Sequence, residues 1–168
     1  MPESPKKIGY AGGAFDLFHI GHLNILKHAR AHCDHLIVGV VSDEMLRLTK
    51  GIDPIVPLSE RLEIVRHISF VDEAVAEVEP NKLDTWRSVG FDVFFKGDDW
   101  RGTDKAARLE RDFAEVDVEV VYFPYTVSTS STQLRRALRA LGSTAHGSPS
   151  DIERRLQAHP HQESRVSS

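Results

Sequence analysis

The stretch Gly12-Gly13-Ala14-Phe15-Asp16-Leu17-Phe18-His19-Ile20-Gly21-His22 decides the fold of this chain. It joins an apolar run at residues 8–11 to residues 23–29, whose apolar side chains recur at helical spacing. The junction is therefore predicted to be a strand, a loop and a helix. Unpaired N–H groups and the positive end of the helix dipole favour an anion there, and the two glycines allow close backbone approach. We interpret the stretch as a phosphate site.

Composition restricts the class of protein. With 168 residues and 40% hydrophobic positions, the chain is expected to form one domain with a sizeable core. A net charge of −4 gives no support for broad nucleic-acid binding. The single Cys33 excludes an internal disulfide, and the start of the chain lacks the apolar core of a secretory signal, so a cytoplasmic location is expected. No apolar run approaches the roughly 20 residues of a membrane span.

Strand and helix patterns alternate along the chain after the first unit. Further strands are predicted at residues 35–41, 70–75, 91–96 and 118–123. Helices are expected between them, with Ser42 and Ser59 as capping residues. This order predicts an α/β domain with a mainly parallel sheet of five strands over residues 1–142. Residues 143–168, rich in Ser, His, Pro and Gln, are predicted to be a disordered or loosely docked tail.

His19 and His22 are three residues apart, so both rings are expected on one side of the helix start. Imidazole N–H donors there would stabilise charge on phosphate oxygens during a displacement at phosphorus. The alternative is two ordinary surface histidines. Asp16 would complete a trio of metal ligands, but partners at the spacing of structural zinc sites are missing, so no metal ligand is assigned.

The run from Phe15 to His22 resembles the HxGH signature of the nucleotidyltransferase superfamily, in the form found in cytidylyltransferases and above all in glycerol-3-phosphate cytidylyltransferases. Four further segments resemble that family in the right order. They are Ser59-Glu60-Arg61, Phe70-Val71-Asp72-Glu73, Gly97-Asp98-Asp99-Trp100-Arg101-Gly102 and Ser130-Ser131-Thr132. The resemblance covers residues 7–141 and implies a Rossmann-like three-layer α/β/α fold.

The resemblance also implies a reaction. CMP would pass from CTP to a small phosphorylated polyol with release of pyrophosphate, and Mg²⁺ would accompany the triphosphate. His19 and His22 would hold the α-phosphate, while Lys50 and Arg61 would supply positive charge. The implied nucleotide-binding residues are Gly12, Gly13, Ala14, Phe15, Asp16, Gly97, Asp98, Asp99, Trp100, Tyr125, Thr126, Ser130, Ser131 and Thr132. A homodimer is expected, because the segment at residues 70–73 lies near the subunit interface in the resembling family.

Several of these residues have simpler interpretations. Lys50 would also suit a solvated loop, and Arg61 could pair with Glu60 or Glu63 on an exposed helix face. Trp100 could belong to the core. The hydroxyls of residues 130 and 131 would cap a helix as readily as they would bind phosphate.

Two departures from the family leave the acceptor open. Ser69 and Tyr125 stand where the glycerol-3-phosphate enzymes commonly carry arginine. The alternatives are a cytidylyltransferase for a small phosphonate, an adenylyltransferase such as an FAD synthetase, and a nucleotide-binding module without turnover.

Overall fold

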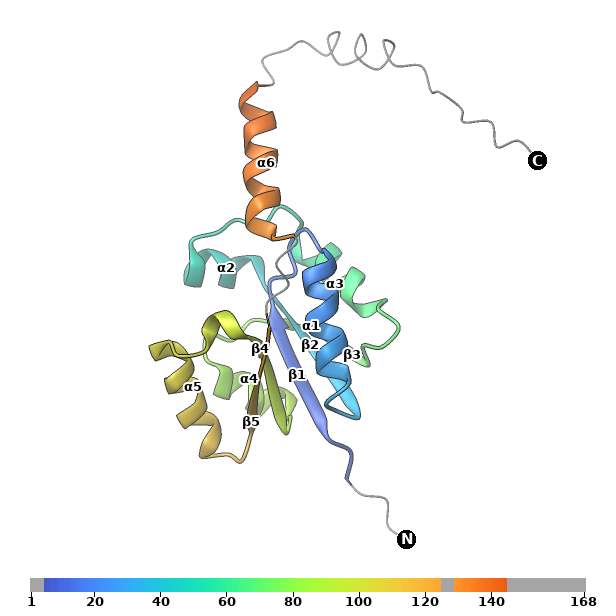
Figure 1. The fold of residues 1–168 in the computed structure, drawn as a ribbon, viewed down its shortest axis with the longest axis vertical. Coiled ribbons are helices and arrows are strands. Elements are labelled where there is room, and N and C mark those ends of the chain that lie inside the picture. Colours follow the sequence, from blue (N-terminus) through green and yellow to red (C-terminus); the bar gives the residue numbers. More distant parts are fainter. Residues whose placement is uncertain (1–4, 125–128, 145–168) are drawn as a thin grey trace, which may run out of the picture. The chain divides into compact units, whose positions relative to one another are not determined.

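The computed structural model describes residues 5–124 and 129–144 of the chain. The chain divides into two compact units, Met1–Ser131 and Thr132–Ser168. The first unit holds one sheet, in which every neighbouring pair of strands is parallel and the strand order is β3-β2-β1-β4-β5 (Figure 1). The strands are β1 Ile8–Gly13, β2 His35–Val41, β3 Glu73–Glu77, β4 Val93–Gly97 and β5 Glu119–Phe123.

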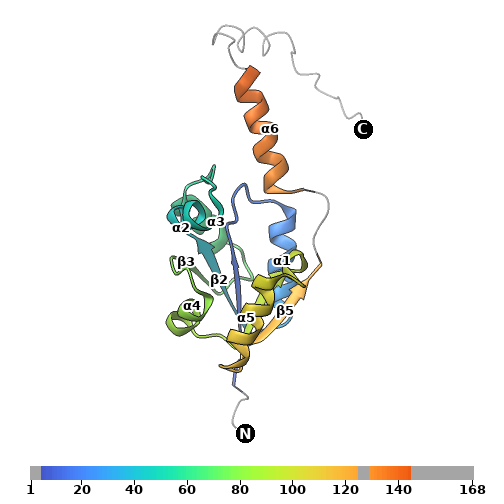
Figure 2. The same cartoon turned by 90° about the vertical axis from the view of Figure 1, so that its left-hand side faces the viewer.

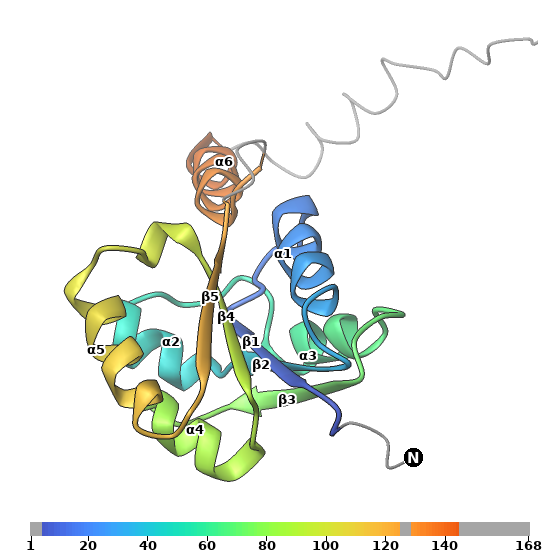
Figure 3. The same ribbon diagram turned by 60° about the horizontal axis from the view of Figure 1, so that its bottom comes forward.

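Helices cover both faces of the sheet, which gives three layers. The helices of the first unit are α1 Ile20–Arg30, α2 Asp43–Lys50, α3 Leu58–Arg66, α4 Lys82–Val89 and α5 Asp104–Ala114, with a short 3₁₀ turn, η1, at Asp98–Trp100. In Figure 3, α1 and α3 lie on one side of the sheet and α2, α4 and α5 on the other. The fold is therefore α/β and Rossmann-like, as predicted. Helix α6, Ser131–Thr144, begins at the last residue of the first unit and continues into the second.

Two apolar clusters, one on each face, hold the layers together. The face under α1 and α3 packs Leu26 and Val65 against Val38 and Phe95 of the sheet. On the other face, the aromatic rings of Tyr10, Phe91, Phe94 and Phe113 pack against one another. Because successive strand residues point to opposite faces, the continuous apolar runs of β2 and β4 supply both clusters, as expected for a parallel sheet covered on both sides.

All strands point the same way, so their carboxyl ends share one edge, where the loops into α1 and α2 begin (Figures 1 and 2). Gly12 pairs with Gly39 and Gly13 with Val40 at the end of β1. Parallel α/β sheets bind ligands at this edge. The fold thus brings the β1–α1 loop to the edge where ligands are expected.

The predicted element boundaries need small corrections. Strand β3 starts at Glu73 rather than at residue 70, and Gly12 and Gly13 belong to β1. Ser42 caps α2 through its side chain, as predicted. Ser59 does not cap α3: the capping residue is Pro57, which has no side-chain acceptor, and Ser59 lies inside the helix. Most of the predicted tail, residues 145–168, lies outside the described residues, and among the described helices none is long and apolar enough to span a membrane.

Candidate active site at the β1–α1 loop

The start of α1 is capped by its own two histidines. His19 is the N-cap, and its Nδ1 accepts a hydrogen bond from the Gly21 N–H at 3.0 Å. His22 Nδ1 accepts in return from the His19 N–H at 3.3 Å. This reciprocal pair has the form of a capping box, with imidazoles in place of the usual hydroxyl and carboxylate. It places the two ring centroids 4.0 Å apart.

The capping bonds also decide which ring nitrogens can donate. A nitrogen that accepts a hydrogen bond carries no proton, so a neutral ring held in this way carries its proton on Nε2. Burial lowers the pKa of His19, which favours the neutral ring at neutral pH. Both histidines therefore offer Nε2–H donors, and the spacing of the motif sets these donors side by side. Such a pair suits the oxygens of a single phosphate.

Aromatic packing fixes the His22 ring from behind. Phe15 lies edge-on to that ring, with 5.4 Å between centroids, and Phe18 lies at 5.3 Å. Phe15 is buried and adopts a φ of +52°, which few residues other than glycine tolerate. A Cβ at Gly13 would lie 3.1 Å from the Phe15 ring, so a side chain there would crowd the ring. Phe15 therefore positions His22, and its predicted nucleotide contact remains a prediction.

Asp16, another predicted nucleotide ligand, holds the loop at residues 51–57. Its carboxylate is buried and accepts from the N–H groups of Ile55, at 3.0 Å, and Val56, at 2.9 Å. The Asp16 carbonyl accepts a hydrogen bond from the Ser131 hydroxyl at 2.6 Å. These bonds tie two distant segments to the β1–α1 loop, so Asp16 acts on the site by organising its surroundings.

Arg61 lies in the interior beneath this edge of the sheet, with a side chain that is 0% exposed. Its Nε donates to the Val56 carbonyl at 2.8 Å, and Nη1 donates to the carbonyls of Ala14, at 2.5 Å, and Val41, at 2.9 Å. Nη2 donates to an oxygen of Asp43 at 2.5 Å. The proposed pairing with Glu60 or Glu63 on an exposed face is wrong. Arg61 instead joins the ends of β1 and β2 to α2 and the 51–57 loop.

The remaining predicted residues are spread over several segments of the chain. Lys50 is the last residue of α2 and is exposed, and Gly97 leads into η1, where Asp98 and Asp99 are exposed and Trp100 is half-buried. Ser130 and Ser131 close the first unit, and the Ser131 hydroxyl donates to the β1–α1 loop as described above. Thr132 belongs to the second unit, while Tyr125 and Thr126 lie outside the described residues.

Comparison with known proteins identifies the family. Residues 10–137 match the cytidylyltransferase-like family. The chain belongs to this family. The glycerol-3-phosphate cytidylyltransferase of Bacillus spizizenii is 34% identical over 130 residues, which cover 77% of this chain and 95% of that protein. The FAD synthase of Thermococcus kodakarensis is 31% identical over 159 residues, covering 86% and 98%.

This cytidylyltransferase-like protein also matches a part of a longer protein and a protein of known structure. The chain spans 26% of the bifunctional protein HldE of Hyphomonas neptunium, with 32% identity over 132 residues. The crystal structure of the lipopolysaccharide core biosynthesis protein from Thermoplasma volcanium superposes with a TM-score of 0.62 at 27% identity, covering 72% of this chain and 97% of that one. The predicted resemblance is confirmed, and the chain is a nucleotidyltransferase enzyme.

Sequence reasoning missed one polar group of the cytidylyltransferase-like protein at the same edge of the sheet. Glu77, at the end of β3, is buried and accepts from the Tyr10 hydroxyl at 2.6 Å and from the Lys82 ammonium. Burial and the neighbouring Glu77 charge both raise the pKa of Tyr10. Lys96 of β4 lies nearby, with its Nζ 4.3 Å from the centre of the Trp100 ring. The sequence did contain a signal for Lys96. It stands two residues after the apolar Phe94 in the same strand, so both side chains face the same side of the sheet.

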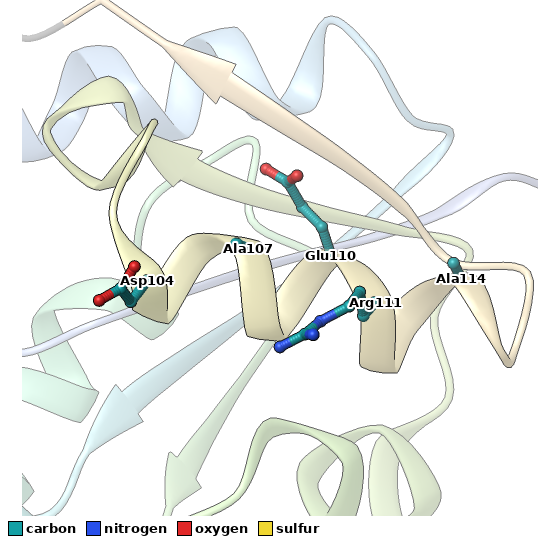
Figure 4. Close-up of a pocket in the computed structure, with 5 residues that line it drawn as sticks. All are labelled: Asp104, Ala107, Glu110, Arg111 and Ala114. Carbon is teal, nitrogen blue, oxygen red and sulfur yellow. The ribbon is translucent and has the colours of Figure 1, made fainter.

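The pocket in Figure 4 lies away from these residues. It is a hollow of about 690 Å³ along α5, lined by Asp104, Ala107, Glu110, Arg111 and Ala114. Figure 4 shows Glu110 and Arg111 pointing to different sides of the helix, and Glu110 accepts from the Tyr122 hydroxyl at 2.6 Å. None of the predicted site residues lines this hollow, so we do not assign it to the reaction.

The Mg²⁺ expected with the triphosphate remains a prediction, and the donor set bears on where it would bind. Within residues 5–124 and 129–144, no group of three or more His, Cys, Asp or Glu side chains is arranged to hold a metal ion. Mg²⁺ keeps several waters and commonly binds to substrate phosphates with one or two carboxylates. Asp98 and Asp99 are exposed carboxylates at the sheet edge and suit that lighter role.

Proposed function

We propose that this nucleotidyltransferase transfers CMP from CTP to a small phosphorylated polyol, or to a small phosphonate, with release of pyrophosphate. An oxygen of the acceptor phosphate forms a bond to the α-phosphorus. The bond from that phosphorus to the bridging oxygen breaks, and pyrophosphate leaves with its electron pair. Support for cytidine comes from the family and from the glycerol-3-phosphate cytidylyltransferase that matches over most of its length.

The observation that carries the proposal is the capping box of His19 and His22. Each Nδ1 is engaged by backbone, so each neutral ring offers its Nε2–H to one phosphate. Donors fixed before the reaction stabilise charge that develops on the α-phosphate oxygens without reorganising. Mg²⁺, bound mainly by triphosphate oxygens, would neutralise the leaving pyrophosphate. Lysines at the sheet edge would balance the remaining negative charge of the two bound substrates.

Nucleotide choice is tested by assaying CTP and ATP side by side. Pyrophosphate release would be measured with Mg²⁺ and a panel of acceptors that pairs each polyol phosphate with its phosphonate analogue. We expect turnover with CTP and with at least one acceptor of the panel. Exclusive use of ATP would overturn the choice of cytidine, and a preference within each pair would separate phosphate from phosphonate.

A substitution at the histidines tests catalysis against simple binding. We expect His19→Ala and His22→Ala each to lower kcat and kcat/KM together by about 10² or more, since each removes a transition-state donor. His67→Ala is the control, because that histidine is exposed at the end of α3. A change in KM alone would contradict the transition-state role. Nucleotide binding without turnover by the unaltered protein would favour a binding module.

A second candidate is adenylyl transfer of the FAD synthase kind. It rests on the match to the Thermococcus kodakarensis FAD synthase across 98% of that protein. The same histidine pair would serve the α-phosphate of ATP, so the geometry at α1 does not separate the two. Formation of FAD from FMN and ATP by the purified protein would establish this candidate.

A further inference from the structure

A buried carboxylate and its partners occupy the sheet surface beside the end of β1. Oε2 of Glu77 accepts from the Tyr10 hydroxyl and Oε1 from the Lys82 ammonium. Gly39 and Gly12 make room for this group. A Cβ at Gly39 would lie 1.7 Å from the Tyr10 hydroxyl oxygen, and one at Gly12 would lie 2.7 Å from Glu77 Oε2. Both oxygens of Glu77 are therefore already engaged by the protein.

Lys96 faces the same side of the sheet but lacks such a partner. Its ammonium lies over the Trp100 ring, and within residues 5–124 and 129–144 it donates no hydrogen bond. Burial, followed by the charges of Lys50 and Lys82, lowers the pKa of Lys96 to about 8, against the opposing effect of Glu77 and Asp99. A half-buried ammonium beside other cations is unfavourable unless an anion completes its surroundings.

The position of Lys96 separates it from the histidines. It precedes Gly97 on β4, next to β1 in the sheet, and it lies on the face covered by α2, α4 and α5 (Figure 3). His19 is the N-cap of α1 and His22 lies in its first turn, and this helix covers the opposite face. The histidines are assigned to oxygens of the α-phosphate. An ammonium on the other face of the sheet would therefore serve a different anionic group, and the proposed reaction has a second anionic substrate, the acceptor.

We propose that Lys96, with Lys50 and Lys82 beside it, binds the doubly charged phosphate or phosphonate group of the acceptor. This inference rests on the proposed function and names the site for its second substrate. Glu77 and Tyr10 act as positioning residues, because they hold Lys82 and occupy the surface that the glycines leave bare. The Lys96 ammonium donates hydrogen bonds to the oxygens of the acceptor's phosphate or phosphonate group.

Steady-state kinetics with a matched control test the site. Lys96→Met keeps the apolar stem and removes the charge, and we expect the acceptor KM to rise about tenfold or more while the CTP KM stays within twofold. Lys105→Met, at an exposed position of α5, removes the same charge elsewhere and is expected to change neither value. An unchanged acceptor KM in a folded Lys96→Met protein would overturn the inference.

The pH dependence separates a charged contact from mere packing. Above pH 8 the Lys96 ammonium loses its proton, so the acceptor KM of the unaltered enzyme should rise there. The charged and titratable groups around it are Lys50 from α2, Lys82 from α4, Glu77 from β3, Asp99 from η1, Tyr10 from β1 and Tyr122 from β5. Lys96→Arg stays charged, so we expect the alkaline rise in KM to disappear. Persistence of the rise in that variant would assign it to another group.

A binding experiment keeps this inference separate from the proposed reaction. In the full chain with reductively methylated lysines, NMR follows the titration of the Lys96 signal, assigned by its absence in Lys96→Met. We expect saturating inorganic phosphate to raise its apparent pKa, because a bound anion favours the charged form. An unchanged titration would overturn the anion site. If the unaltered enzyme turned over no CTP yet phosphate shifted Lys96, the proposed function would fail and the anion site would stand.

Discussion

Individual backbone hydrogen bonds decide which ring nitrogen carries the proton in each histidine of the β1–α1 loop. The two Nδ1 atoms accept from backbone N–H groups, which a protonated ring could not do. His32 is the opposite case, because its Nδ1 lies 2.8 Å from the His28 carbonyl oxygen and so donates. The same side chain is therefore fixed in different tautomers by different backbone partners.

This contrast predicts a spectroscopic difference. At pH 7.5 we expect ¹⁵N–¹H correlation spectra to show His19 and His22 as Nε2–H tautomers and His32 as an Nδ1–H tautomer. The two kinds of ring give distinct nitrogen shifts, so one spectrum includes its own control. Nδ1–H signals from both His19 and His22 would contradict the capping arrangement and the donor role derived from it.

The lowered pKa of His19 gives a sign to the pH dependence. The unfolded chain binds a proton on this histidine at higher pH than the folded chain does, so protonation favours unfolding. The contribution of His19 to stability is thus fully present above pH 6.5 and is lost as the pH falls below it. We expect kcat/KM to decline over the same range, because a proton on Nδ1 breaks the cap. A pH–rate profile of the unaltered enzyme measures this decline. His67→Ala leaves the cap intact and is expected to give the same profile.

Arg61 is a residue whose charge serves the architecture. Its guanidinium donates to carbonyls that end separate elements and to the Asp43 carboxylate, in the interior. A planar fork makes these bonds at once, which a lysine ammonium cannot copy. Without it, the carbonyls of Ala14, Val41 and Val56 would lose this donor in a part-buried region, and the partly exposed Asp43 carboxylate would lose its ion pair.

Loss of Arg61 should therefore appear first as loss of stability. We expect Arg61→Met to lower the free energy of unfolding by about 3 kcal/mol or more, because three backbone carbonyls each lose a charged donor. Arg66→Met removes an arginine from the exposed end of α3, whose partner Glu63 is also exposed, and should cost less than about 1 kcal/mol. Urea unfolding followed by circular dichroism measures both values. Equal losses of stability in the two variants would contradict this structural role of Arg61.

At the scale of elements, capping chemistry and strand periodicity placed most of the helices and strands. Ser42 accepts from the Met45 N–H at 3.2 Å and so begins α2, and Asn81 and Thr103 begin α4 and α5 in the same way. Helix α3 begins two residues earlier than a cap at Ser59 would imply, with Pro57 as its N-cap. Proline suits a helix start because its φ angle is fixed and it has no N–H to satisfy. Capping propensity favours serine over proline as an N-cap, so it did not predict Pro57 at this position.

The two serines give a paired test of this difference. We expect Ser42→Ala to lower the free energy of unfolding by about 1 kcal/mol, because it removes an N-cap acceptor. Ser59→Ala should leave stability unchanged or raise it slightly, since alanine is the better residue inside a helix. Chemical denaturation of both variants checks the pair, and a larger loss for Ser59→Ala would move the cap back to that residue.

At the scale of the whole molecule, the oligomeric state remains a prediction. The family segment at residues 70–73 leads into β3, an edge strand of the sheet. Within the protomer, Asp72 accepts from the Leu36 N–H at 2.7 Å and from Arg30 at 3.1 Å, which holds this segment against β2. An ordered edge is a suitable surface for a twofold contact.

We expect a homodimer with twice the protomer mass, formed by the full chain. Light scattering coupled to size exclusion, run across a wide range of protein concentrations, measures the mass directly. A mass equal to that of one protomer at every concentration would refute the prediction. The result bears on assembly alone, because the histidines and lysines argued above all come from a single chain.

Local sequence patterns were sufficient to predict the fold class, the order of strands and helices along the chain, and the proximity of His19 and His22. These features follow from local periodicity and from a spacing of three residues, which short-range geometry converts into contact. Family resemblance then indicated the reaction class. For Arg61, Asp16 and Phe15 the same reasoning found the residues but not the contacts that they make.

The contacts of those residues depend on how distant parts of the chain come together. Arg61 reaches Ala14 and Val41, and Glu77 reaches Tyr10, across strands that are distant along the chain. No local pattern encodes such contacts, because they depend on which strands become neighbours and in what register. The sheet order that sets β1 between β2 and β4 brings Lys96 to the edge occupied by the histidine loop. Burial there then lowers the pKa of Lys96, which composition and spacing could not reveal.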